Sequence, residues 1–343
     1  MPAAALAWSS SAVFSVSRSP ISLLQQKRSR LRRSRAPLWS CVSPRTVQVG
    51  GELRFSEFFS HGAGLTTSLD ALLHCEHSGI QHICVVQSPV FGRMLLLDGM
   101  VMLTEWDEFI YHEMLVHPAL FLLPSPRRVL VIGGGDGGTV REVLRHPSIE
   151  HVDLVEIDPR VIAVAQSYFP TVAAGFSDPR VHLHHADGAE FVRSAPSGFY
   201  DAVFVDSTDP TGIAESLFGE AFYSECQRVL HATGVLALQS ESPLHPVYCQ
   251  TLPRVHRLLR PLFRHVASYL APIPTYPTGI WSFTLASRHY HPLEDFSPTN
   301  AQQRMECLSG KLRYYTAELH RAAFALPGFV QELISEGLAQ PAP

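Results

Sequence analysis

From residue 128 onward, short and nearly continuous apolar runs alternate with longer segments whose apolar positions have helical spacing. The apolar runs predict strands at 128–133, 151–158, 181–187, 200–207 and 234–240. The segments between them predict helices at 137–146, 159–169, 188–195 and 216–230. Strands that are apolar throughout are typical of a parallel sheet covered on both faces. The pattern therefore predicts an α/β protein with a doubly wound sheet.

The region before this sheet has a different pattern. Short β-branched or apolar runs with glycine-containing breaks predict strands at 82–87, 92–99 and 101–104. A helical pattern follows at 105–122, with acidic residues in its first turn. We therefore expect a β-rich domain at 52–118 and an α/β domain at 119–343, whose last helices pack back onto the sheet.

The first 51 residues are unlike the rest of the chain. They contain eleven Ser, seven Arg and one Lys, and no Asp or Glu. A basic, serine-rich and acid-free segment is typical of an organelle transit peptide. We expect import into a plastid rather than a mitochondrion. If the segment is instead a basic tail with no targeting function, we expect the protein to be cytoplasmic.

Charge and cysteine content narrow the class of protein. The whole chain has a net charge of −4, and without the eight positive charges of the first 51 residues it has −12. Such an acidic body argues against a nucleic-acid partner and is compatible with a cationic substrate. The six cysteines form no C-x-x-C pair, so we expect reduced and inert thiols. No apolar run reaches 18 residues, so we expect no transmembrane helix.

Acidic residues follow four successive predicted strands. In the order of those strands they are Asp136, then Glu156 and Asp158, then Asp187, then Asp206 and Asp209. Ligands of doubly wound sheets bind beyond the carboxyl ends of the strands. The sequence therefore predicts an acidic ligand site at this edge.

The loop GGGDGG at 133–138 indicates what lies over it. It satisfies G-x-G-x-x-G between a predicted strand and helix, and Glu156 follows Gly138 at the spacing typical of a ribose-binding acid. These features favour a nucleoside. Asp136 would repel a pyrophosphate, so a cationic tail is favoured over a dinucleotide. An S-adenosyl sulfonium compound fits, and its decarboxylated form fits better because the loop offers no base for a carboxylate.

DSTDP at 206–210 has two readings. Asp-Pro and Ser-Thr favour an Asx-type turn with a helix cap. Alternatively, the two carboxylates act as a general base and an anchor for a diamine. An alkylammonium has a pKa of about 10 and must lose a proton before it attacks, which a positioned carboxylate can accept. Tyr111 and Tyr276 would then line the amine channel.

Five segments together resemble spermidine synthase, the putrescine aminopropyltransferase. They are LLLDGMVMLTEWDEFIYHEM, VLVIGGGDGGTVREVLRHPSIEHVDLVEID, DSTDPTGIAESLF, PIPTYPTGIWSFTLAS and LRYYTAELHRAAFALPGF. The resemblance covers about residues 52–335. It implies a Rossmann-like, methyltransferase-type doubly wound sheet with a small N-terminal β domain, in a homodimer or homotetramer. It also implies aminopropyl transfer from decarboxylated S-adenosylmethionine to putrescine, giving spermidine and methylthioadenosine without a metal or redox cofactor.

The same resemblance assigns site residues. It implies donor contacts at Gln81, Asp136, Glu156, Asp187 and Gly188. It implies amine contacts at Tyr111, His112, Asp206, Asp209 and Tyr276, with Asp206 as the proton acceptor. No metal site is expected, because His112 and His117 are not at the zinc spacing H-E-x-x-H.

Two departures and three alternatives bear on this assignment. Family members often have Trp-Phe/Tyr-Ser/Thr-Glu where this chain has LRFSE at 53–57, and many have proline where Ile213 stands. The alternatives are an aminopropyltransferase with another amine acceptor, a small-molecule S-adenosylmethionine-dependent methyltransferase, and a non-catalytic polyamine-binding subunit. Asp136 disfavours the methyltransferase, and the intact GGGDGG and DSTDP disfavour the non-catalytic subunit.

Overall fold

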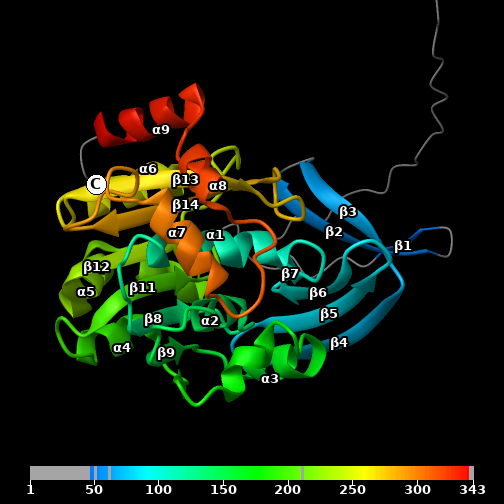
Figure 1. The fold of residues 1–343 in the computed structure, drawn as a ribbon. Helices are drawn as coiled ribbons and strands as arrows, with labels where there is room; N and C mark the ends of the chain where they lie inside the picture. The colour runs from blue at the N-terminus through cyan, green and yellow to red at the C-terminus, as the bar shows by residue number, and fades with distance from the viewer. Residues whose placement is uncertain (1–46, 50–51, 61–62, 210–211, 340–343) are drawn as a thin grey trace, which may run out of the picture. The chain divides into compact units, whose positions relative to one another are not determined.

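A seven-stranded sheet forms the centre of the protein in the computed structural model, which describes residues 47–49, 52–60, 63–209 and 212–339 (Figure 1). Its strands, in spatial order, are β10 (Val181–His184), β9 (His151–Val155), β8 (Arg128–Gly133), β11 (Tyr200–Asp206), β12 (Leu230–Gln239), β14 (Ile280–Ser287) and β13 (His265–Pro272). The chain starts this sheet at β8, adds β9 and β10 on one side, and then crosses to add β11 and β12 on the other. The point where the order reverses lies between β8 and β11.

The predicted doubly wound sheet is confirmed for the first five strands, which pair in parallel. The remaining two differ from the prediction. β14 pairs antiparallel with β12, and β13 pairs antiparallel with β14. A hairpin therefore closes this edge of the sheet, because the short connection between β13 and β14 leaves no room for a crossover helix.

Helices cover both faces of the sheet, as the apolar strands require. One core joins alternate strand residues such as Val131 and Phe204 to five α-helices. These are α1 (Glu108–Leu120), α2 (Gly138–Leu144), α3 (Pro159–Tyr168), α7 (Pro298–Glu306) and α8 (Ala317–Ala323). The other core joins the intervening residues, such as Ile132 and Val205, to the opposite layer. That layer contains α4 (Gly188–Ser194), the 3-10 helix η2 (Gly212–Phe218), α5 (Glu220–Val229) and α6 (Thr251–Leu259).

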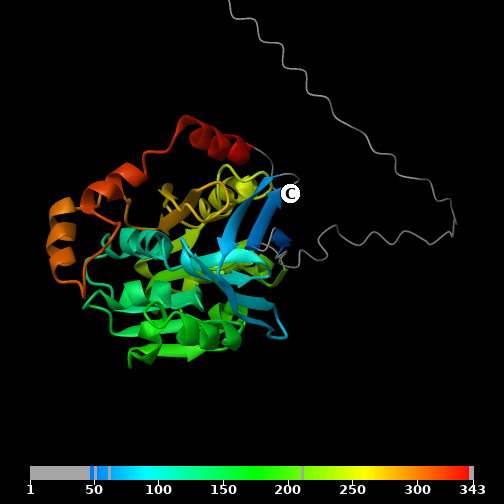
Figure 2. The same ribbon diagram turned by 90° about the vertical axis from the view of Figure 1, so that its right-hand side faces the viewer.

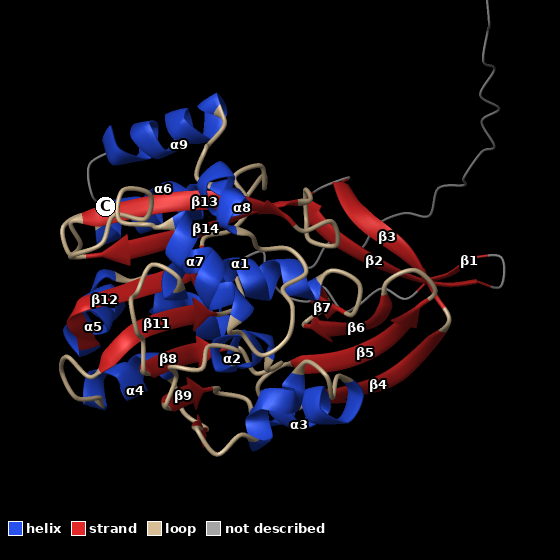
Figure 3. Cartoon of the chain, in the orientation of Figure 1, coloured by secondary structure: helices blue, strands red, loops and turns tan. Residues whose placement is uncertain are grey.

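The region before α1 consists of two antiparallel sheets (Figures 2 and 3). They are β1 (Val47–Val49), β2 (Glu52–Ser60) and β3 (Ala63–Leu69), and then β4 (Ala71–His77), β5 (His82–Ser88), β6 (Gly92–Leu97) and β7 (Met100–Thr104). The predicted strands at 82–87, 92–99 and 101–104 are confirmed within a few residues. Ile83 and Leu95 pack against Val161 of α3 (Pro159–Tyr168). This contact joins the four-stranded sheet to the α/β region.

The predicted helices are confirmed, with shifted ends. α1 begins at Glu108 rather than 105, because the Asp107 carboxylate accepts hydrogen bonds from Thr104 and Thr275 and holds the preceding turn. Of the predicted 216–230 helix, the first residues belong to the 3-10 helix η2. The last helices pack back as expected: α9 (Gly328–Ala339) lies on α6, where Val330 and Leu252 share a small core. The division into domains at residue 118 stays a prediction.

The predicted leader lies mostly outside the described residues. Only Val47–Val49 are described, and they pair with β2 as strand β1. The expectation of unpaired thiols is wrong for two cysteines. Cys75 and Cys84 face each other across β4 and β5 and form a disulfide. Within the described ranges, no helix is both long and apolar enough to cross a membrane.

Candidate active site

Five neighbouring strands each bring an acid to the carboxyl edge of the central sheet. In spatial order these acids are Asp187 after β10, Glu156 after β9, Asp136 after β8, Asp206 at the end of β11, and Glu241 after β12. They surround the point where the strand order reverses, which is where doubly wound sheets bind ligands. A cleft of about 920 Å³, including its open mouth, lies there.

Most of the predicted site residues line this cleft. Those that do are Gln81, Tyr111, Asp136, Glu156, Asp187, Gly188, Asp206 and Tyr276. Asp209 and His112 do not line it. Asp209 lies beside Glu241. His112, predicted to line the amine channel, is buried against Asp136 instead.

The glycines of the 133–138 loop let other groups approach it closely. Gly133 has a φ of 78°, and a Cβ there would lie 2.1 Å from the Asp206 carbonyl oxygen. A Cβ at Gly138 would lie 2.1 Å from the His112 ring. The backbone N–H of Gly134 also donates to the Asp206 carbonyl at 2.9 Å. Glycine is therefore required here by the residues that build the acidic edge, not only by a ligand.

One end of the cleft suits a nucleoside. The buried carboxylate of Glu156 accepts the backbone N–H of Asp158 at 2.9 Å, and burial raises the pKa of Glu156 to about 7. Gln81 reaches this end from the loop before β5 and donates to the Asp158 carboxylate at 3.0 Å. Asp187 accepts two backbone N–H groups at the start of α4, and so its position is set by the helix.

Asp206 is held by two hydroxyl groups. Tyr111 donates to its Oδ1 at 2.7 Å, and Thr139 donates to its Oδ2 at 2.7 Å. Burial raises the pKa of Asp206, and the nearby charge of Asp136 raises it further. Thr139 was not predicted. It directly follows the glycine loop, but nothing in the sequence shows that α2 turns its hydroxyl toward β11.

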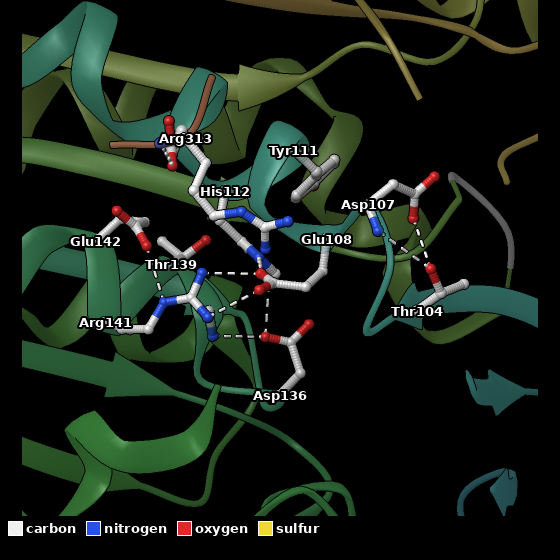
Figure 4. A network of polar contacts seen from close by, with 12 residues as sticks. Thr104, Asp107, Glu108, Tyr111, His112, Asp136, Thr139, Arg141, Glu142 and Arg313 are labelled. Atoms are coloured by element: carbon white, nitrogen blue, oxygen red, sulfur yellow. Dashed lines mark hydrogen bonds and ion pairs between the residues drawn. The ribbon is translucent and has the colours of Figure 1, made fainter. Parts of the chain in front are cut away.

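Asp136 belongs to a buried chain of charges (Figure 4). Its Oδ1 accepts the backbone N–H of Gly138 at 2.7 Å and lies 3.4 Å from Nε2 of His112. Burial opposes the charge on His112, but Asp136 and Glu108 more than offset it and raise the pKa of His112 to about 10. Burial likewise opposes the charge on Asp136, and His112 outweighs it, so the pKa of Asp136 is lowered. The raised pKa favours the charged form of His112 beside Asp136.

A second group of carboxylates surrounds Asp209. Burial raises the pKa of Asp209 to about 6, and burial together with Asp209 raises that of Glu241 well above its usual value. Glu57, which accepts the Val101 N–H, is also buried, and burial raises its pKa to about 7. The Oε2 atom of the Glu241 side chain has no hydrogen-bond partner. The backbone of Glu241 has a φ of 64°, which is uncommon for a residue other than glycine. These features are typical of a site that receives a cation.

Glu241 and the role of Glu57 were missed in the sequence. Glu241 follows the fifth predicted strand, so extending the search for strand-end acids by one strand would have found it. Glu57 lies in LRFSE, a segment that was noted only because it departs from the family pattern. The side chain of Ile213 lies outside the described residues. The described residues contain no group of three or more His, Cys, Asp or Glu side chains arranged to hold a metal.

Two tyrosines, Tyr111 and Tyr276, form part of the wall of the cleft. The rings of Tyr111 and Tyr276 have centroids 5.8 Å apart, and the Tyr276 hydroxyl donates to the Met102 carbonyl at 2.5 Å. Tyr111 comes from α1 and Tyr276 from the turn between β13 and β14. The turn of the antiparallel hairpin formed by β13 and β14 therefore supplies part of the site.

Known proteins with the same sequence features are aminopropyltransferases. The family model described as spermine/spermidine synthase domain matches residues 108–297, and the model described as spermidine synthase tetramerisation domain matches residues 54–105. The polyamine aminopropyltransferase of Alkaliphilus metalliredigens is 42% identical over 286 residues, covering 83% of this chain and 99% of that protein. That of Moorella thermoacetica is 45% identical over 280 residues, covering 82% and 95%.

Solved structures agree with these matches. Spermidine synthase from Thermotoga maritima has a TM-score of 0.78 at 38% identity, covering 87% of this chain and 98% of that one. A spermidine synthase in complex with the transition-state analogue AdoDATO has a TM-score of 0.79 at 38% identity, covering 87% and 99%. The family model and the relatives each match more than half of the chain. The chain therefore belongs to the spermine/spermidine synthase family and is an enzyme that transfers aminopropyl groups.

Proposed function

We propose that the enzyme transfers the aminopropyl group of decarboxylated S-adenosylmethionine to putrescine, giving spermidine and methylthioadenosine. The observation that carries this proposal is the pair of half-buried carboxylates, Asp136 and Asp206, at adjacent strand ends of a nucleoside-type cleft. A dinucleotide or phosphate would be repelled there. A sulfonium donor with a free ammonium, and a cationic amine acceptor, would both be attracted.

The donor is assigned to the end of the cleft lined by Glu156 and Asp187. Glu156 would accept the two ribose hydroxyls, Asp187 and Gly188 would lie at the adenine, and Gln81 would close the nucleoside from the N-terminal sheets. Asp136 would accept the ammonium of the aminopropyl tail. The carboxylate that ordinary S-adenosylmethionine carries on the same carbon would face Asp136 unfavourably.

The acceptor is assigned to the space between Asp206 and the group around Asp209. Tyr111 and Tyr276 would flank the methylene chain, and Asp209 with Glu241 would hold the distal ammonium. The near ammonium gives a proton to the Asp206 carboxylate. Its nitrogen then forms a bond to the carbon next to sulfur, and the carbon–sulfur electron pair returns to sulfur to give the neutral thioether. The sulfonium is already a good leaving group, so no acid and no cofactor are needed on the donor side.

An assay of acceptor preference tests this function. The purified protein is incubated with labelled decarboxylated S-adenosylmethionine and a panel of diamines and triamines. We expect putrescine to have the highest kcat/KM, with spermidine and methylthioadenosine formed in equal amounts. A higher kcat/KM for another amine would show that this amine, and not putrescine, is the preferred acceptor. If the protein instead used only ordinary S-adenosylmethionine as a donor and transferred its methyl group, a methyltransferase would be favoured.

The protein is also proposed to act as a homodimer or homotetramer. Apolar side chains on the N-terminal sheets support this, because Phe58 is 54% exposed, Leu72 53% and Val90 63%. Exposed apolar side chains of this size can be buried when two copies of the chain associate. The match of residues 54–105 to a tetramerisation domain agrees with this assignment.

We further propose that most of residues 1–51 direct import into a plastid, as their basic, acid-free composition favours. Since Val47–Val49 form strand β1, cleavage is expected before residue 47. Residues 1–51 fused to a fluorescent protein should enter plastids in cells that contain both organelles. A mitochondrial signal would correct the organelle, and a diffuse cytosolic signal would contradict the import role.

A further inference from the structure

A chain of alternating charges runs from the cleft into the contact between α1 and α2 (Figure 4). From Asp136 it continues through His112 and Glu108 of α1 to Arg141 of α2. Only Asp136 lines the cleft. The other three do not touch the space assigned to the substrates.

The contacts in this chain are short and directional. The guanidinium of Arg141 binds the Glu108 carboxylate with two parallel hydrogen bonds of 2.9 and 2.8 Å. Glu108 in turn lies 2.7 Å from Nδ1 of His112, and Nε2 of His112 lies 3.4 Å from Asp136. A two-pronged contact of this kind fixes the plane of the carboxylate as well as its position. The orientation of the His112 ring is therefore set from Arg141.

We propose that Arg141 is a positioning residue for the donor: through Glu108 and His112 it holds the Asp136 carboxylate oriented toward the aminopropyl ammonium. This inference rests on the proposed function. It assigns to Arg141 a role in recognising one part of one substrate, rather than a general role in the fold.

Electrostatics explains why such a chain is needed. Asp136 lies near Asp206 and Glu156, and two neighbouring buried carboxylates disfavour each other's charge. The His112 cation offsets the charge of Asp136. A buried cation also needs a partner, which Glu108 supplies, and the Glu108 carboxylate is balanced by Arg141. Removing Arg141 takes away the two hydrogen bonds that fix the plane of the Glu108 carboxylate, so the His112 ring is no longer held in one orientation toward Asp136.

Arg141→Met should therefore impair the donor selectively. Met keeps much of the side-chain length and packing but has no charge. We expect calorimetry to show about tenfold weaker binding of decarboxylated S-adenosylmethionine, the scale of a charge-assisted hydrogen bond. Binding of methylthioadenosine, which has the nucleoside but no ammonium, should change less than about twofold. In kinetics the KM for the donor should rise more than kcat falls.

Arg145→Met is the matched control. Arg145 caps the C-terminal end of α2, has a similar exposure, and contacts Glu142 through Nε at 2.7 Å. Glu142 also contacts Arg141, so both substitutions remove a cation from the same buried carboxylate. Arg145 has no contact with Glu108, and its substitution should leave the affinity for the donor unchanged.

Glu108→Gln is a second, independent test that does not depend on the folding of Arg141→Met. It keeps the volume of the side chain and removes the charge that holds His112, so it should give the same selective loss. Equal weakening of the donor and of methylthioadenosine in both variants would overturn the inference, as would an unchanged donor affinity. If the wild-type enzyme binds no decarboxylated donor, the proposed function fails instead.

Discussion

Asp206→Asn is expected to lower kcat about 100-fold or more, the usual scale for the loss of a general base. The attacking amine arrives as an ammonium with a pKa of about 10, and it has no lone pair until its proton is removed. Asp206 ends a buried strand and is held by Tyr111 and Thr139, so its carboxylate has a fixed direction. Asparagine keeps the shape and cannot accept the proton. Steady-state kinetics at saturating putrescine measures the effect.

The pH dependence gives a second check on this role. The fraction of free amine rises about tenfold per pH unit below its pKa, so the deficit of Asp206→Asn should shrink between pH 7 and 9.5. A deficit independent of pH would point to misplacement of the substrates. Near wild-type kcat at neutral pH would show that another group is the base.

Asp209→Asn is the comparison variant. Asp209 lies away from the cleft wall beside Glu241, where it would bind the distal ammonium in both the ground state and the transition state. Its loss should therefore appear mainly as a higher KM for putrescine. If Asp209→Asn lowered kcat as strongly as Asp206→Asn, the two roles would not be separable in this way.

Asp136→Asn is expected to weaken binding of the decarboxylated donor at least about tenfold, or about 1.4 kcal/mol. The substitution removes the charge that faces the donor ammonium and leaves the His112 cation with Glu108 as its one remaining carboxylate partner among these residues. A buried cation beside an incoming ammonium is repulsive, which adds to the loss. Calorimetry with the decarboxylated donor and with S-adenosylmethionine measures it. The preference for the decarboxylated form should fall.

The same variant should also shift the pH profile of kcat. Burial raises the pKa of Asp206, and the charge of Asp136 raises it further. Without that charge the pKa of Asp206 falls, so the base stays ionised to lower pH and the acid limb of the profile moves down. If the variant still discriminated between the two donor forms as the wild type does, and the acidic side of its kcat–pH profile did not move, Asp136 would not contact the donor.

The acidic edge was predictable because it depends on local information. Asp187, Glu156, Asp136 and Asp206 each follow an apolar run that can form a buried strand. Parallel strands of a doubly wound sheet place their carboxyl ends on one edge. These acids therefore lie at the same edge, and the details of side-chain packing do not change this. Glu241 obeys the same rule and was reachable from the sequence.

The surroundings of these acids were not predictable in the same way. Thr139 and Arg141 follow the glycine loop on α2, and their partners lie on β11 and α1. His112 was expected in the amine channel, and the packing of α1 against α2 turned it toward Asp136 instead. The rotation of each helix about its axis decides these contacts, and the pattern along one segment does not determine it.

By itself, the sequence determined the alternation of strands and helices, the placement of an acid after each of four successive strands, and the chemical kind of ligand that such an edge accepts. Those properties follow from the period of apolar positions and from residue type, which act over a few residues at a time. Only the tertiary structure decided the antiparallel closure by β13 and β14, the hydroxyl groups on Asp206, and the charge chain from Arg141 to Asp136. These contacts join residues far apart in the chain, and close packing of whole elements selects them.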